Sequence, residues 1–227
     1  MLPFDSIYLL LIIPVLVGWF AQWRVRQIYN RYLRIPTRKG IKGIEVAKAI
    51  MSYHHLNIPV LQTGKPMLNY YNPQGKTLHL SERIAEHGSI TSMGIVAHEV
   101  EHAIQDHQDC RFMVLRNKMA KLLAIMGQFS PLIFMWGIVF RNILFIYVGI
   151  ILLFGMAVFA VLSLPVELNA SSRAINTLRN TGIADQEELK MVRTVLRHAA
   201  LTYFAAVAQR MGTFLFIVMI LFLSHQM

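Results

Sequence analysis

Cysteine and charge are both scarce in this chain of 227 residues. Cys110 is the only cysteine, which excludes an internal disulfide and fits a reducing compartment. Charged residues make up 15% of the sequence against 55% hydrophobic residues, and the mean hydropathy is +0.46. This composition is too apolar for an ordinary soluble domain, and no internal repeat or low-complexity tract is present. The sequence therefore predicts a membrane protein.

The apolar residues form four segments that are each long enough to cross a membrane, which takes about 20 residues. They are residues 4–23, 122–140, 143–164 and 204–223. The fourth contains Arg210, whose side chain we expect to face protein or the membrane interface. We expect a mainly α-helical membrane protein with four transmembrane helices, in which residues 1–227 form a single integral-membrane domain.

The distribution of basic residues predicts the orientation of the chain. Residues 24–121 contain 15 of the 22 lysines and arginines, and residues 165–203 contain five more. Short flanks rich in lysine and arginine stay in the cytoplasm, so we expect both segments to be cytoplasmic and both termini to lie outside. No basic residue precedes the first apolar segment, the reverse of a cleaved signal sequence, so that segment is expected to remain as an anchor.

The formal net charge of +10 raises the question of nucleic-acid binding. The basic residues, however, crowd the flanks of the apolar segments and do not form a patch interleaved with exposed aromatic residues. The expected partner is therefore the lipid bilayer with its anionic headgroups, and no nucleic acid.

The most informative stretch is His98-Glu99-Val100-Glu101-His102, which lies in a segment without proline and rich in helix formers. Residues four apart share a face of a helix, so His98 and His102 can direct their imidazoles at one metal ion with Glu99 beside them. A catalytic zinc ion usually takes three protein ligands and a water, so a third ligand must come from elsewhere. The pattern predicts a zinc hydrolase site on a helix that Thr91 and Ser92 cap.

Residues 58–81 differ from the helical stretches around them. The sequence Asn72-Pro73-Gln74-Gly75 separates two runs of high β propensity and predicts a hairpin. We expect Thr77–Ser81 to offer an open strand edge to an extended peptide, with His79 on the surface or in a cleft. The alternative is a strand that only braces the helix behind it.

Glu167 is the candidate third ligand. It follows the third apolar segment, and Pro165 predicts a new helix with Glu167 in its first turn. The second and third apolar segments would form a transmembrane hairpin that returns the chain to its starting side, which allows Glu167 to approach His98 and His102. A carboxylate in the first turn of a helix is also stabilising without a metal, and this alternative stays open.

Four segments of the sequence carry a resemblance to a known family. They are Leu78–Ser81, His98–Gln105, Leu164–Ser171 and Ala199–Tyr203. Together they resemble the YugP-like bacterial membrane zinc metallopeptidases, a group of neutral zinc metallopeptidases, and more distantly the HtpX-like and CAAX-processing gluzincins. The resemblance implies a zincin-like α+β domain on the cytoplasmic side of the bacterial inner membrane. It also implies one Zn²⁺ ion bound by His98, His102 and Glu167, with Glu99 as the general base.

Three positions depart from the usual sequence of that family. Glu101 stands in place of glycine, Asn169 in place of aspartate, and Tyr70-Tyr71-Asn72-Pro73 in place of His-Tyr-Asp-Pro. The metal ligands are unaffected. We expect the Glu101 carboxylate to pair with a nearby arginine or to narrow the cleft, so these departures bear on substrate preference.

Peptide hydrolysis at such a site uses a zinc-activated water, from which Glu99 takes a proton that it passes to the leaving amine. The developing oxyanion needs a further hydrogen-bond donor. His198, Tyr203 and Arg173 are the candidates, with His198 and Tyr203 ranked first. Ser171, one turn after Glu167, either contacts a metal-ligating histidine or faces a neighbouring helix.

The function that follows is an integral-membrane zinc metalloendopeptidase acting on membrane-associated or unfolded proteins. A second hypothesis is a non-catalytic zinc-containing scaffold that recruits a partner, which a fourth ligand such as His79 or Asp106 would favour. A transporter with a regulatory zinc site is disfavoured, because the apolar segments hold almost no ionisable residue. The sequence leaves the substrate and the oligomeric state open.

Overall fold

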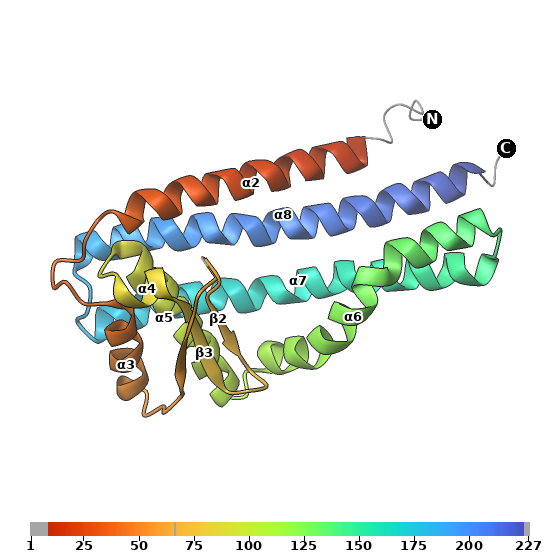
Figure 1. Ribbon diagram of the computed structural model, residues 1–227. Coiled ribbons are helices and arrows are strands. Elements are labelled where there is room, and N and C mark those ends of the chain that lie inside the picture. Colours follow the sequence, from red (N-terminus) through yellow and green to blue (C-terminus); the bar gives the residue numbers. More distant parts are fainter. Residues whose placement is uncertain (1–8, 66, 225–227) are drawn as a thin grey trace. The chain divides into compact units, whose positions relative to one another are not determined.

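A computed structural model describes residues 9–65 and 67–224, which are mainly helical (Figure 1). The elements are α2 (Leu9–Leu33), α3 (Gly43–Tyr53), β1 (Val60–Thr63), β2 (Tyr70–Asn72), β3 (Thr77–Ser81), α4 (Glu82–Glu86), α5 (Ile90–His107), α6 (Arg111–Val139), α7 (Ile143–Asn180) and α8 (Gln186–Ser224).

The chain divides into two compact units, and four of its helices contribute residues to both. The first unit comprises residues up to Gln22, Leu115–Pro165 and the residues from Thr202 onward. The second unit comprises Trp23–Val114 and Val166–Leu201, and so contains the whole sheet together with α3, α4 and α5.

The sheet of the second unit has three strands in the order β1-β3-β2. Strand β2 runs antiparallel to β3, with Asn72 opposite Thr77, so the predicted hairpin is confirmed. The prediction that Thr77–Ser81 has an open edge is wrong, because β1 pairs in parallel with the other side of β3. The edge strands are β1 and β2. The turn sequence predicts only the hairpin partner, whereas the pairing with β1 depends on how the preceding segment folds back.

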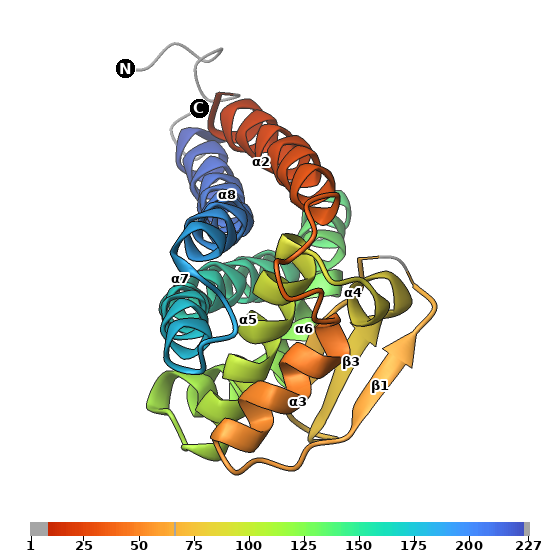
Figure 2. The ribbon, with the colours of Figure 1, turned by 90° about the vertical axis from the view of Figure 1, so that its left-hand side faces the viewer.

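Helix α5 packs against β2 and β3, and α3 lies beside α5 (Figure 2). It begins after Ser89, whose side-chain oxygen accepts a hydrogen bond from the Ser92 N–H, so Ser89 is the cap and not Thr91 and Ser92 as predicted. Leu78 and Leu80 of β3 are buried, while His79 between them is half-buried. The core between the sheet and the helices therefore holds α5 in place along most of its length.

Helix α7 runs without a break from Ile143 to Asn180, with Pro165 inside it. The prediction of a new helix at Pro165 is therefore wrong. Proline removes one backbone hydrogen bond, but Val166, Ala170 and Ala174 on the following turns are buried, and this packing keeps the chain helical. Because Glu167 lies in the interior of a helix, the stabilising effect of a helix N-terminus cannot explain its presence.

The first unit consists of helical segments that carry large exposed apolar side chains. Trp19, Phe140 and Ile151 are each more than 60% exposed. Extensive apolar exposure of this kind is typical of a surface that contacts lipid or another protein.

The prediction of four transmembrane helices is wrong. Among the described residues, two helical stretches are long and apolar enough to cross a membrane: Ile143–Asn180, which is α7, and Gln186–Met219 of α8. The described apolar stretch of α6 is Phe129–Val139, too short for a span of about 20 residues. The first predicted span, residues 4–23, begins outside the described residues. Helix α2 contains the rest of it and continues through Arg24, Arg26 and Arg31.

Candidate metal centre

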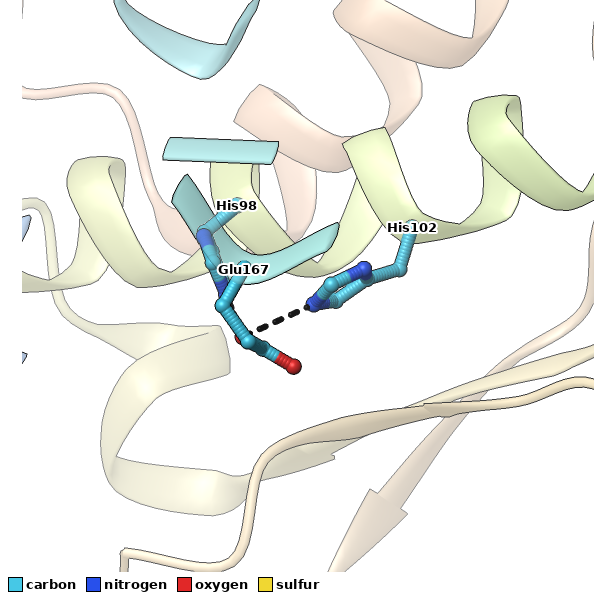
Figure 3. A group of neighbouring side chains, drawn as sticks. All are labelled: His98, His102 and Glu167. Carbon is cyan, nitrogen blue, oxygen red and sulfur yellow. Dashed lines mark hydrogen bonds and ion pairs between the residues drawn. The ribbon is translucent and has the colours of Figure 1, made fainter. Parts of the chain in front are cut away.

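Two histidines of α5 and one glutamate of α7 come together in the second unit (Figure 3). Glu167 Oε2 lies 3.2 Å from His98 Nε2 and 3.4 Å from His102 Nε2. The two imidazole rings are 4.7 Å apart with their planes at 80°, so they approach the carboxylate from different directions. All three side chains are buried. The structure thus brings the three predicted ligands to one point, although Glu167 is 69 positions from His98.

The donor atoms and their spacing fit a zinc ion. Two imidazole nitrogens and one carboxylate oxygen are a common ligand set of catalytic zinc. Ligand atoms about 2.0 to 2.2 Å from one tetrahedral ion lie about 3.3 to 3.5 Å from each other, close to the separations between Glu167 and the histidines. A cation bound among the three side chains would therefore demand little movement of the helices.

No further histidine, cysteine, aspartate or glutamate joins this group within the described part of the chain. His79 Nε2 lies 2.9 Å from Thr77 Oγ1, and its ring stacks on Tyr70. Asp106 accepts hydrogen bonds from the Tyr71 hydroxyl and from Lys76 Nζ. Both residues that would have favoured a closed structural site are therefore engaged elsewhere.

A hydroxyl on α7 contacts the outward-facing nitrogen of His98. Ser171 Oγ lies 3.2 Å from His98 Nδ1, whereas His98 Nε2 faces Glu167. Of the two roles left open for Ser171, contact with a histidine is therefore the one observed. A hydrogen bond of this kind fixes the direction in which the other ring nitrogen points.

A buried glutamine holds the second histidine. Gln105 Oε1 lies 2.9 Å from His102 Nδ1, and Gln105 Nε2 donates to Asn169 Oδ1 at 2.9 Å and to the Val166 carbonyl at 3.2 Å. Because a carbonyl only accepts, the amide nitrogen must face Val166 and the amide oxygen must face His102. His102 therefore carries its proton on Nδ1, which leaves the lone pair of Nε2 available to a metal.

Glu101 is completely buried on α5 next to the metal pair. Its carboxylate accepts hydrogen bonds from Arg173 Nε at 2.7 Å and from the Thr177 hydroxyl. Arg173 also donates to the side chain of Gln108 at 2.8 Å. Of the two expectations for Glu101, pairing with an arginine is the one observed. The contacts join α5 to α7 about two to three turns beyond Glu167, and they engage Arg173, a predicted oxyanion donor.

Strand β2 contacts the proposed general base. The backbone N–H of Tyr71 donates to Glu99 Oε2 at 3.1 Å, and the Tyr71 hydroxyl donates to Asp106 at 2.7 Å. Burial, together with the bond to Asp106, holds the pKa of Tyr71 well above its ordinary value. The edge strand is thus attached to α5 at two points, and one of them orients the Glu99 carboxylate.

The other two predicted oxyanion donors, His198 and Tyr203, lie on α8. His198 donates from Nδ1 to the Thr194 carbonyl one turn earlier on α8, at 2.8 Å. Tyr203 lies further along α8 and belongs to the first unit, whereas the three candidate ligands belong to the second. The catalytic roles of His198 and Tyr203 stay predictions.

Three groups around the centre were missed by the sequence analysis: the Gln105 side chain, the Thr177 hydroxyl and the Tyr71 backbone N–H. Gln105 carried a usable signal, since it lies three residues after His102 on the same helix face. The other two carried none, because they approach α5 from separate elements.

Comparison with known proteins assigns the class. The chain belongs to a family of zinc metallopeptidases, since the family described as "Putative neutral zinc metallopeptidase" matches residues 7–222. The "Putative membrane protease YugP" of Bacillus subtilis (strain 168) is 32% identical over 191 residues, which cover 84% of this chain and 85% of that protein. No solved structure matches the chain. The resemblance stated from the sequence is confirmed, and with it the class of zinc-dependent, membrane-associated proteases.

Proposed function

We propose that the protein is an integral-membrane zinc endopeptidase of the bacterial cytoplasmic membrane, which hydrolyses peptide bonds of membrane-associated or unfolded proteins. The observation that carries this proposal is the convergence of His98, His102 and Glu167 without a fourth such ligand among the described residues. Zinc sites with three protein ligands are typically catalytic, whereas structural sites have four.

The three side chains would hold one Zn²⁺ ion. A zinc ion bound there would supply a Lewis acid that polarises the substrate carbonyl and acidifies a water molecule. Glu99 takes a proton from the attacking water and delivers it to the leaving amine, while the Tyr71 N–H keeps its carboxylate oriented. His198 and Tyr203 are the proposed donors to the oxyanion, a contribution of about 3 to 4 kcal/mol in comparable sites.

The proposed location is the cytoplasmic side of the membrane. Residues 24–121 and 165–203 hold 20 of the 22 basic residues, which supports cytoplasmic placement of both segments. We propose that residues 1–227 act as one membrane protease. The outside location of both termini stays a prediction that reporter fusions at each end would test.

The test uses full-length protein purified in a neutral detergent, with zinc content and casein cleavage measured on the same sample. Glu99→Gln is expected to keep zinc and to lose at least about a hundredfold in cleavage rate, because it removes the base and leaves the ligands. His102→Ala and Glu167→Ala are expected to lose both zinc and activity. Glu82→Gln, the same change at an exposed position of α4, is the matched control.

Two results would contradict the proposal. Cleavage by Glu99→Gln at the wild-type rate would remove the proposed base. A wild-type protein that holds zinc through four protein ligands, measured by X-ray absorption, and cleaves nothing would favour the scaffold hypothesis.

A further inference from the structure

A pocket of about 270 Å³ lies between α7 and α8 in the second unit. From α8 it is lined by Arg193, Leu196 and Arg197, and from α7 by Leu168, Ser171 and Ser172. The polar lining is thus two guanidinium groups and two hydroxyls, on a floor that is otherwise apolar. The guanidinium groups only donate hydrogen bonds and a hydroxyl can donate as well, so this lining favours an anionic ligand.

The two arginines lie one turn apart on the same face of α8. Neither makes an ion pair or a side-chain hydrogen bond within the described residues. The acidic side chains of the two helices are engaged elsewhere: Glu167 faces the histidines, Glu187 pairs with Lys190, and buried Glu188 accepts hydrogen bonds from the backbone N–H groups of Arg38 and Asp185. The positive charge at the pocket is therefore not neutralised by either helix.

The pocket also lies at a defined level along both helices. Within residues 9–65 and 67–224, the helical stretches long and apolar enough to cross a membrane are α7 and Gln186–Met219 of α8. No charged residue occurs in 143–164 of α7 or in 201–209 of α8. On α7 the pocket lining starts at Leu168, one turn after the first of these stretches, and on α8 it ends at Ala200, directly before the second. If both helices cross a bilayer, this is the level of the lipid headgroups.

We propose that this pocket binds the phosphate of an anionic phospholipid. Arg193 and Arg197 hold the phosphate oxygens, since a guanidinium presents paired donors that match phosphate. The Ser172 hydroxyl donates to the same group, and the glycerol carbons lie against Leu168 and Leu196. A volume of about 270 Å³ suits a headgroup and excludes a whole lipid, so the acyl chains remain in the bilayer. The inference rests on the membrane placement in the proposed function and not on the peptidase chemistry.

In the experiment, dioctanoyl phosphatidylglycerol is titrated into zinc-loaded full-length protein in neutral detergent, and the heat of binding is measured by isothermal titration calorimetry. Saturable binding is expected, at least about tenfold tighter than for dioctanoyl phosphatidylcholine, which carries no net charge. Replacing both Arg193 and Arg197 by Gln is expected to weaken binding of phosphatidylglycerol about tenfold or more. Replacing Lys48 and Arg179 by Gln removes the same charge at exposed positions outside the pocket and is expected to leave binding unchanged.

A second variant separates a filled pocket from a lost charge. Ser172→Trp keeps every arginine and fills the pocket from an exposed position, so it is expected to abolish binding without lowering the thermal unfolding temperature. Unchanged binding by this variant, or by the double arginine variant, would overturn the proposal.

Two further outcomes would also overturn it. Equal weakening in the Lys48/Arg179 control would show that total charge attracts the lipid. Inorganic phosphate that binds as tightly as the lipid would identify a site for a free anion. Glu99→Gln is expected to bind the lipid like the wild type, so failure of the peptidase proposal would not be confused with failure of this one.

Discussion

Gln105→Met tests whether the hydrogen bond on the outer nitrogen of His102 sets the affinity for zinc. Methionine has nearly the same length as glutamine and is apolar, so it fills the buried site of Gln105, which is 2% exposed. The change removes the acceptor 2.9 Å from His102 Nδ1, and with it the restraint on the tautomer and the ring direction. Loss of such an outer contact typically costs 10- to 100-fold in metal affinity, about 1.4 to 2.7 kcal/mol.

The same substitution also has a cost in stability that is separate from the metal. Asn169 Oδ1 and the Val166 carbonyl lose their donor, for which we expect about 1 to 3 kcal/mol in the free energy of unfolding. Zinc affinity is therefore measured on folded protein by competition with a chromophoric chelator, and unfolding is measured without metal. Gln74→Met, the same change at an exposed turn position, is the control and is expected to alter neither quantity.

The reasoning would be refuted by a Gln105→Met protein that binds zinc as tightly as the wild type. That result would mean that the positions of His98 and His102 on α5 and of Glu167 on α7 are enough to orient the imidazoles. The hydrogen bonds of Gln105 would then not be needed for zinc affinity.

Two further predictions concern the contacts that join α5 to its neighbours. Glu101→Gln leaves the Arg173 guanidinium without its carboxylate partner and is expected to lower the free energy of unfolding by about 2 to 3 kcal/mol. The cost is smaller than for a fully buried pair, because the Arg173 side chain is 28% exposed and recovers some hydration. Urea denaturation should show a smaller cost in an Arg173→Met background, and equal costs would exclude coupling. Folding raises the pKa of Tyr71 above its ordinary value of about 10, so protonated Tyr71 contributes stability that is fully present below pH 10. This contribution is lost as the pH rises from there toward the folded-state pKa. Tyr71→Phe, which also loses the bond to Asp106, should therefore show a flatter decline in unfolding temperature above pH 10, and parallel declines would contradict this reasoning.

Local features of the chain were predicted well because short-range geometry decides them. The spacing of His98 and His102 places both imidazoles on one face of any helix, whatever that helix packs against. The turn sequence from Asn72 to Gly75 likewise predicts the β2-β3 hairpin from backbone preferences alone.

The wrong predictions share a different origin, which is packing between distant segments. Pro165 is a helix-starting signal by itself, but buried Val166 and Ala170 keep α7 continuous across it. Strand β3 loses its expected free edge because β1 folds back beside it. The count of transmembrane helices was too high for another reason: four apolar segments were taken as spans, whereas among the described residues two helical stretches are long and apolar enough to cross a membrane.

The sequence by itself determined the chemistry available to this protein: two imidazoles on one helix face, an adjacent carboxylate, and the family to which the chain belongs. The tertiary structure decided which carboxylate meets the imidazoles, that Gln105 and Ser171 orient them, and that Glu101 binds Arg173. These contacts join residues of α5 to residues of α7 that are 60 or more positions away, apart from that of Gln105 with His102 on the same helix. Their distances follow from how the two helices pack, which no spacing along the chain encodes.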